Sequence, residues 1–185
     1  MSDISLRLDK LKKLIQTEDF LFGRGLSNEV NIRIFCYAPS EEMTIKYFVD
    51  TLLQDRTIVC NIHHYDLYKV FLEICDDKKI ISSIPSVEHK RGTRFLLKQL
   101  ISIAPNTAFV NKMLFSPQEI GKDLILLSGV GDVFPFIRVH NLLEAMQPHF
   151  SIPILVLYPG KYEDAQLQLF GKLPPNSYYR AFNIV

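Results

Sequence analysis

The chain has 185 residues, of which 48% are hydrophobic, enough to fill one sizeable core but too few for two ordinary domains. Its 21 lysines and arginines nearly balance 20 aspartates and glutamates, so no global field exists to attract DNA or an anionic membrane. The sequence therefore predicts a single domain over residues 1–185 with no direct DNA binding by overall charge. Any nucleic-acid role would have to come from a local patch.

The cysteines and the N-terminus indicate where the protein resides. Cys36, Cys60 and Cys75 lack the spacing of metal ligands, and at least the first two fall in apolar runs, so we expect buried free thiols in a reducing compartment. The first residues have no apolar signal-peptide core, and no stretch approaches ~20 apolar residues. We therefore expect a cytosolic protein.

The first half of the chain alternates helical and strand patterns. Residues 1–20 carry apolar side chains at spacings of three and four, which predicts an amphipathic N-terminal helix. An apolar run ending at Pro39 predicts a first strand, and Ser40 is the expected N-cap of a helix over 41–55. The run TIVCNIHHY predicts a second strand, and Asp66 is placed to cap the following helix.

Residues 80–122 contain no convincing strand. The segments RFLLKQLISI and AFVNKMLF have helical spacing, and the run Ser116 to Glu119 has the pattern of a capping box with proline at the first helical position. This stretch is longer than a crossover connection needs. The sequence therefore predicts a helical insertion that forms a lobe beside the sheet.

The segment from Asp123 to Gly160 predicts one complete strand, turn, helix and strand, with the helix from about 136 to 150. After it, AQLQLFG is expected to be short helical or irregular structure, and YYRAFNIV to form a fifth strand. The predicted fold is an α/β domain with a five-stranded, mostly parallel sheet flanked by helices. Its shape would resemble a P-loop NTPase or a Rossmann fold.

The phosphate-binding loop of such folds is missing. In the expected place, Tyr37 to Thr44, only Thr44 fits the P-loop pattern, and two carboxylates would face a polyphosphate. Gly129 and Gly131 offer a weaker anion loop, but Asp132 would repel phosphate. Tight-turn glycines explain the pair more simply, and we expect both to have a positive φ that other side chains resist. We expect no nucleotide hydrolysis at the first turn.

Other candidate catalytic groups do not combine into a site. Arg138 and His140 are two positions apart and cannot share a helix face, and we expect the arginine to be buried against Asp132 or a strand-end carbonyl. His63 and His64 are adjacent on a strand and face opposite sides, which disfavours zinc. Ser128 lacks the flanking pattern of a nucleophile elbow, and no histidine partner is placed for it by sequence. The sequence predicts no catalytic residue, cofactor or metal.

Aromatic and arginine side chains gather near the C-terminus. Tyr158, Tyr162, Tyr179 and Arg180 belong to the last two predicted strands and the turn between them. Tyrosine and arginine carry much of the binding energy at protein interfaces, which makes these four residues candidates for partner binding. Equally, they could plug the end of the sheet and bond their polar groups locally.

Three segments resemble the BrxB family, a component of BREX bacteriophage-exclusion operons. They are GVGDVFPFIRVHNLLEAMQP, PILVLYPGKYEDAQLQLFGKL and NSYYRAFNIV, and FCYAP followed by a helix fits the same family upstream. The resemblance implies a small cytosolic component of an anti-phage system, alongside a DNA methyltransferase, a large ATPase and a PglZ-type protein of the alkaline phosphatase superfamily. It supplies no catalytic residues.

Two functions follow as hypotheses. The first is a non-catalytic interaction subunit of a BREX complex that binds the PglZ-type protein. The second is a regulatory subunit that binds a small ligand or nucleotide at the carboxyl edge of the sheet. The residues assigned to that alternative edge are Gly129, Gly131, Asp132, Arg138 and His140.

Overall fold

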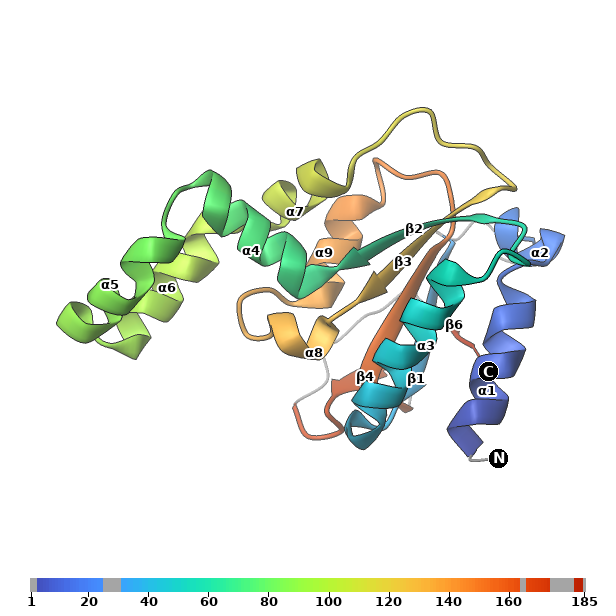
Figure 1. Cartoon of the computed structure of the whole chain (residues 1–185), viewed down its shortest axis with the longest axis horizontal. Coiled ribbons are helices and arrows are strands. Elements are labelled where there is room, and N and C mark those ends of the chain that lie inside the picture. The colour runs from blue at the N-terminus through green and yellow to red at the C-terminus, as the bar shows by residue number, and fades with distance from the viewer. Residues whose placement is uncertain (1–2, 25–30, 164–165, 174–181, 185) are drawn as a thin grey trace.

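A computed structural model of the chain describes residues 3–24, 31–163, 166–173 and 182–184 (Figure 1). Five parallel strands form its sheet, in the order β2-β3-β4-β1-β6. They are β1 (Ile32–Tyr37), β2 (Asn61–Asp66), β3 (Asp123–Ser128), β4 (Ile154–Glu163) and β6 (Phe182–Asn183). The predicted α/β fold with a five-stranded, mostly parallel sheet is confirmed, and each strand coincides with a predicted run, although β2 and β4 continue past the predicted ends to Asp66 and Glu163.

A sixth strand, β5 (Gln166–Leu169), pairs antiparallel with the end of β4. The prediction of helical or irregular structure here was wrong. The four residues QLQL alternate polar and apolar side chains, which is the period of a strand, and Leu167 is buried beneath the hairpin. At Gly160 a Cβ atom would lie 2.2 Å from the carbonyl oxygen of Gln168, so only glycine allows the two strands to approach this closely.

Helices cover both faces of the sheet and make a three-layer sandwich. One face packs against α1 (Asp3–Leu14) and α3 (Glu42–Gln54), with Phe35 in the centre of that layer. The other face packs against α4 (Leu67–Asp77), α7 (Asn106–Met113) and α9 (Val139–Met146). Successive strand residues serve opposite layers, because strand side chains alternate between faces.

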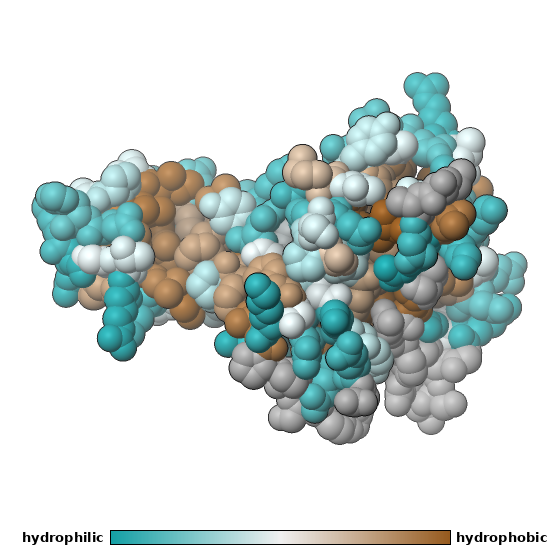
Figure 2. Space-filling model, turned by 90° about the horizontal axis from the view of Figure 1, so that it is seen from below, coloured by the Kyte–Doolittle hydropathy of each residue, from teal (hydrophilic) through white to brown (hydrophobic). Residues whose placement is uncertain are grey.

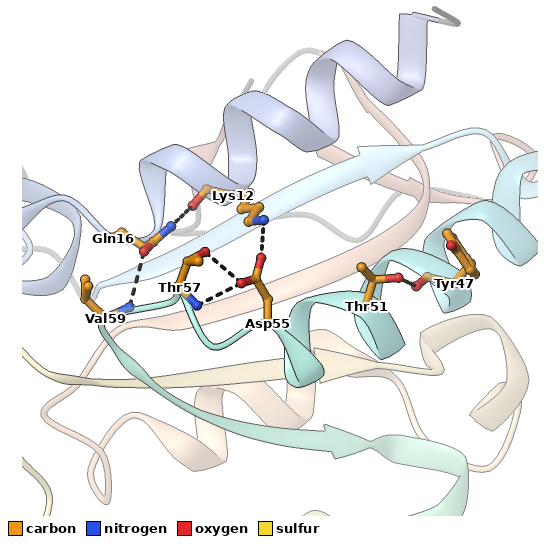
Figure 3. Close-up of polar contacts among 7 residues, drawn as sticks. All are labelled: Lys12, Gln16, Tyr47, Thr51, Asp55, Thr57 and Val59. Atoms are coloured by element: carbon orange, nitrogen blue, oxygen red, sulfur yellow. Dashed lines mark hydrogen bonds and ion pairs between the residues drawn. The ribbon is translucent and has the colours of Figure 1, made fainter.

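Polar contacts fasten α1 to the turn that follows α3 (Figure 3). Lys12 forms an ion pair with Asp55, and the other carboxylate oxygen of Asp55 accepts from the backbone N–H of Thr57 at 2.8 Å and from its hydroxyl at 2.7 Å. Gln16 accepts from the backbone N–H of Val59 at 3.2 Å. These bonds hold the pKa of Asp55 well below its usual range, first through Lys12 and then through Thr57. The short helix α2 (Glu18–Leu21) follows α1.

Between α4 and α7 the chain forms a helical projection, which we call the arm and define as residues 78–103. It contains the 3-10 turn η2 (Ile81–Ser83), α5 (Ile84–Arg91) and α6 (Thr93–Ile103), and α5 and α6 lie against each other at the end of the molecule opposite α1 (Figure 1). The predicted helical character of this region is confirmed.

The helix predicted to begin at Ser116 is absent from the described stretch 114–122. The polar groups that would cap it bond elsewhere. Gln118 donates to the carbonyl of His149 at 2.9 Å and accepts from the N–H of Ser151 at 3.0 Å, and the N–H of Glu119 donates to a carboxylate of Asp123 at 2.8 Å. Tertiary hydrogen bonds therefore replace the local capping box.

Two further predicted boundaries are corrected. The single helix expected over 136–150 is shortened to α9, and an additional short helix, α8 (Val130–Val133), forms in the predicted turn, with Pro135, which has no N–H to donate, between the two. Before α3, a 3-10 turn, η1 (Pro39–Glu41), contains Ser40, which is therefore not the N-cap of α3. By contrast, Asp66 caps α4 as predicted, accepting from the N–H groups of Tyr68 and Lys69. None of the helices in the described ranges is long and apolar enough to cross a membrane.

Candidate functional site

The carboxyl ends of β1, β3 and β4 meet at one edge of the sheet, where open α/β folds place their sites. Three hollows surround this edge. The largest, which we call the hairpin hollow, has a volume of about 360 Å³ and lies between α1, the end of β1 and the β4–β5 hairpin. Its lining residues come from these elements: Arg7, Cys36, Tyr37, Ala38, Pro39, Gly160, Lys161, Tyr162, Glu163, Phe170 and Gly171.

In the turn after β1, where a phosphate-binding loop would hold its ligand, carboxylates accept the hydrogen bonds that the turn can donate. The Tyr37 hydroxyl donates to Glu42 at 2.6 Å, and the N–H of Ala38 donates to Glu41 at 3.3 Å. Burial, and then the bond to Glu42, raises the pKa of Tyr37 far above its usual value, so the hydroxyl keeps its proton. The turn therefore directs negative charge at the place where a P-loop directs N–H groups.

Arg7 and Cys36, which line the hairpin hollow, bond to each other. The Arg7 guanidinium donates to the carbonyl of Cys36 at 2.6 Å and lies 4.6 Å from the centre of the Phe35 ring. Burial raises the pKa of the Cys36 thiol to about 12, so it is inert as a nucleophile. All three cysteines are free and buried, as predicted.

The second hollow, the His64 hollow, has a volume of about 230 Å³ and lies between α3, α4 and the ends of β2 and β3. It is lined mainly by polar side chains: Glu42, Ile45, Lys46, Val49, Asp50, His64, Asp66, Lys69 and Ser128. At its rim Lys46 binds Asp132 at 2.8 Å, and this bond raises the pKa of the lysine. The ion pair ties α3 to α8 across the edge of the sheet.

Within the His64 hollow, His64 Nε2 lies 2.8 Å from the hydroxyl oxygen of Ser128. Sequence analysis found no histidine partner for Ser128, and the structure supplies one because β2 and β3 pair in register, with Asp66 opposite Ser128. Burial lowers the pKa of His64 and so favours its neutral form. A serine beside a neutral histidine is half of a nucleophilic triad. Among the described residues no carboxylate is hydrogen-bonded to His64, so the orienting third member is not in place.

The third hollow is a small cavity of about 40 Å³ between α8, α9 and the β4–β5 hairpin. It is lined largely by apolar side chains, together with Arg138, His140 and Tyr158: Val130, Phe134, Ile137, Val139, Leu167, Leu169 and Leu173. Burial lowers the pKa of His140 and raises that of Tyr158. A space of this size holds about one water molecule and is far too small for a nucleotide.

The five residues assigned to the alternative ligand edge do not converge. Asp132 pairs with Lys46, whereas Arg138 is exposed, lies 5.7 Å from the ring of Phe134 and borders the small cavity with His140. The expectation that Arg138 is buried against Asp132 or a strand-end carbonyl was therefore wrong, because Arg138 is exposed and α3 supplies the partner of Asp132.

The two glycines of this turn serve different purposes. Gly129 has a φ of +70°, the left-handed conformation that was predicted, and a Cβ there would lie 2.5 Å from a carboxylate oxygen of Asp66. Gly131 has no such angle, contrary to prediction. A Cβ at Gly131 would lie 3.0 Å from the ring of Phe170 and 3.2 Å from Pro159. This position therefore requires a residue without a side chain, and not one with a positive φ.

The predicted partner-binding residues are only partly placed by the structure. Tyr162 is half-buried and lines the hairpin hollow. Tyr158 is 4% exposed and belongs to the core, so it can support this surface from below but cannot contact a partner directly. Tyr179 and Arg180 lie outside the described residues.

Two features escaped sequence analysis. One is the His64–Ser128 pair, which depends on strand register. The other is an exposed apolar pair on α3, where Met43 is 75% and Tyr47 is 74% exposed, four positions apart. The helical period could have revealed this pair, because the buried face of α3 is set by Ile45, Val49 and Leu52.

On metals, no group of three histidine, cysteine, aspartate or glutamate side chains in the described part of the chain could hold an ion. His63 and His64 face opposite sides of the sheet, as predicted. His63 stacks on Phe115 at 3.9 Å between ring centres and lies 3.5 Å from Asp123, while His64 faces Ser128.

Comparisons with known proteins decide the family. The family described as "BREX protein BrxB" matches residues 63–184. A "BREX protein BrxB" of Bacillus cereus (strain H3081.97) is 32% identical over 100% of this chain and 99% of its own length. The chain belongs to the BrxB family. A second BrxB, from Escherichia coli O9:H4 (strain HS), is 26% identical over 98% of this chain and 92% of its own length. No solved structure gives a significant match. BrxB membership confirms the resemblance inferred from the C-terminal segments, and the full-length alignments extend it over the helical insertion.

Proposed function

We propose that this BrxB-family chain is a non-catalytic interaction subunit of a BREX defence complex and that it binds the PglZ-type protein. Its family membership supports a role in a BREX system. The hairpin hollow is the observation that carries the interaction role. It is a concave surface of about 360 Å³ with aromatic walls and a charged rim, suited to receive a projecting segment of a partner.

Three side chains in or next to the β4–β5 hairpin contribute accessible area to this surface. Tyr162 and Phe170 are half-buried and offer apolar area, and Lys161 is exposed beside them. Phe170 has a left-handed backbone with a φ of +57°, which a large side chain adopts only when its surroundings enforce it. Its ring packs edge-on against Phe134 with centres 6.2 Å apart. This strained and well-supported aromatic is typical of a binding surface.

Co-purification with the PglZ-type protein of the same BREX system tests the proposal. Tyr162→Ala and Arg180→Ala should each weaken binding by about 1–2 kcal/mol, or roughly 5–30-fold, while the fold survives. Because the interface would depend on shape and desolvation, binding should tolerate moderate salt. Tyr47→Ala is the matched control, since Tyr47 is an exposed tyrosine on a different surface.

Two results would contradict this assignment. If Tyr162→Ala retains the partner as well as the parent chain does, the hairpin hollow is not the interface, and retention by Arg180→Ala removes Arg180 as a candidate. If Tyr47→Ala alone loses the partner, the interface lies on α3 around Met43 and Tyr47. Turnover of an activated ester that is lost in Ser128→Ala would contradict the non-catalytic role.

The His64 hollow favours a second candidate, a regulatory subunit that binds a small ligand. Its polar lining includes two lysines, three carboxylates and the His64–Ser128 pair, which together can donate and accept hydrogen bonds. Calorimetric titration with nucleotides and other small phosphates tests it directly. Saturable binding that is lost in His64→Gln would favour regulation by a ligand, and no heat change would remove this candidate.

A further inference from the structure

The near-neutral total charge conceals a separation of charge along the chain. The arm, residues 78–103, contains six lysines and arginines and one carboxylate, Glu88, and so carries a net charge of +5. Because the whole chain carries +1, the remaining residues together carry −4. The six cations are Lys78, Lys79, Lys90, Arg91, Arg94 and Lys98. The arm is therefore a local positive patch, which the near-neutral net charge of the whole chain does not exclude.

The cations of the arm are exposed and uncompensated. All six are solvent-exposed, and none forms an ion pair with a described residue. Glu88 forms no ion pair with a described residue, and its carboxylate accepts from the hydroxyl of Thr93 at 2.9 Å across the turn between α5 and α6. Arg91 stacks on Phe95, with 3.7 Å from the guanidinium carbon to the ring centre, a contact that does not use its N–H groups as hydrogen-bond donors.

Four of these cations are close together in the sequence around the turn at Gly92. Lys90 and Arg91 are the last residues before it, while Arg94 and Lys98 follow on α6 one helical turn apart, on the same side of that helix. No residue of α5 is fully buried, and apart from Ile84 and Val87, which are half-buried and pack toward the core, its side chains are exposed. Figure 2 shows hydrophilic side chains at the outer end of the arm and hydrophobic ones nearer the sheet.

The outer arm lacks what a protein interface needs. Large hydrophobic side chains that are exposed occur only at its base, at Ile81 and Ile101, and none lies among residues 82–100. Protein interfaces depend on buried apolar or aromatic anchors. Single-stranded nucleic acids are bound by exposed aromatic rings on which bases stack. Phe95, the aromatic side chain of this segment, is half-buried and covered by Arg91. What the outer arm offers is positive charge and hydrogen-bond donors.

We propose that the arm binds the phosphate backbone of a nucleic-acid duplex through Lys90, Arg91, Arg94 and Lys98. A duplex presents a dense row of phosphates, and contacts to phosphate fix the position of a protein without reading the sequence. A projecting helical pair can reach this backbone while the sheet body, with its net negative charge, stays away from it. Binding is therefore independent of base sequence and does not depend on the function of the hairpin hollow.

Fluorescence anisotropy of the full chain with a labelled DNA duplex of arbitrary sequence tests this proposal. If all four cations contact phosphates, the slope of log K against log salt is about −3 to −4, and affinity falls by roughly 100-fold between 50 and 200 mM salt. A labelled RNA duplex of the same length distinguishes the two sources of phosphate backbone. Tighter binding to either duplex identifies the natural ligand class.

Two triple variants of equal net charge distinguish an effect of the arm cations from an effect of the total charge. The arm variant is Lys90→Gln, Arg91→Gln and Arg94→Gln. The body variant is Lys10→Gln, Lys13→Gln and Arg56→Gln, which are also exposed cations without an ion pair among the described residues. Each variant lowers the net charge from +1 to −2. The arm variant should lose at least 10-fold in affinity and about three units of salt slope, while the body variant keeps both within a small change.

Each other outcome overturns the proposal. If the parent chain binds neither duplex at 50 mM salt, the arm is not a nucleic-acid site. If both variants lose affinity equally, the binding is due to total charge. If the arm variant keeps duplex binding but no longer co-purifies with BREX proteins, the arm is an interface for an acidic protein. Circular dichroism confirms that both variants fold, and retention of the PglZ-type partner by the arm variant separates this test from that of the hairpin hollow.

Discussion

The sheet body and the arm differ in whether their charged side chains have bonding partners. At the carboxyl edge of the body, carboxylates are used internally: Glu42 accepts from Tyr37, Asp66 caps α4, and Asp132 pairs with Lys46. On the arm, by contrast, six exposed cations have no ion-pair partner among the described residues. The carboxylates named above already bond within the fold. The arm cations, which have no ion-pair partner among the described residues, remain available to another molecule.

This difference implies two modes of recognition in one small chain. The hairpin hollow would select a partner by shape and desolvation, and its affinity should change little with salt. The arm would act through a screened electrostatic attraction that weakens steeply as salt increases. Salt concentration therefore separates the two surfaces without any mutation.

The largest expected difference between body and arm concerns two phenylalanines that each carry a stacked arginine. Phe35 is 0% exposed in the sheet, with Arg7 above it, while Phe95 is half-buried on α6, with Arg91 above it. Phe35→Ala should lower the free energy of unfolding by about 4 kcal/mol, because it leaves a cavity in the core. Phe95→Ala should lower it by about 1 kcal/mol. Urea denaturation of both variants measures the difference.

Equal losses for the two phenylalanine variants would show that the arm is as much a part of the cooperative core as the sheet. A loss confined to protection of the arm amides in hydrogen exchange, with unchanged global unfolding for Phe95→Ala, would instead make the arm a separate unit of local stability.

A pair of glycines gives the next largest effect. Gly129 in the body and Gly92 in the arm both have positive φ, +70° and +81°, so alanine is strained at either position. Only at Gly129 would the new Cβ also collide, at 2.5 Å from the carboxylate of Asp66, whereas nothing lies within 4 Å at Gly92. We expect Gly129→Ala to cost about 3 kcal/mol and Gly92→Ala about 1–2 kcal/mol. If thermal unfolding shows a larger loss of stability for Gly92→Ala than for Gly129→Ala, backbone strain costs more than the clash of the new Cβ atom.

Much of the fold could be predicted because its signals are local. The strands are continuous apolar runs, the helix over 3–14 has a clear period, and Asp66 precedes its helix as a cap should. The errors arise where distant groups override local patterns. Gln118 bonds to His149 and Ser151 instead of helping to start a helix.

The candidate site was harder to predict because it depends on register and on which helix lies over which strand. The residues Ser128 and His64 come together only because β2 pairs with β3, and their spacing of 64 positions carries no signal in the sequence. Asp132 was assigned to Arg138 nearby, but α3 delivers Lys46 from 86 positions away. The charge of the arm, by contrast, could have been read by counting over residues 78–103 instead of over the whole chain.

The smallest expected effect is a dependence of stability on pH that resides in the body and not in the arm. Burial lowers the pKa of His64, and the charges around it act in both directions: Asp66 and Asp50 raise the pKa, and Lys69 lowers it. Because the folded pKa lies below the unfolded value of about 6.5, the unfolded chain binds more protons between the two values, and the free energy of unfolding decreases as pH falls through that interval.

His64→Gln removes this proton linkage, so the free energy of unfolding should fall less steeply between pH 7 and 5 than in the parent chain. Some slope remains, because burial also lowers the pKa of His140. The matched control is His89→Gln, which changes an exposed histidine on the arm and should leave the parental slope intact. Denaturant titrations at several pH values measure all three slopes. If His64→Gln leaves the parental slope unchanged, His64 does not carry this pH dependence.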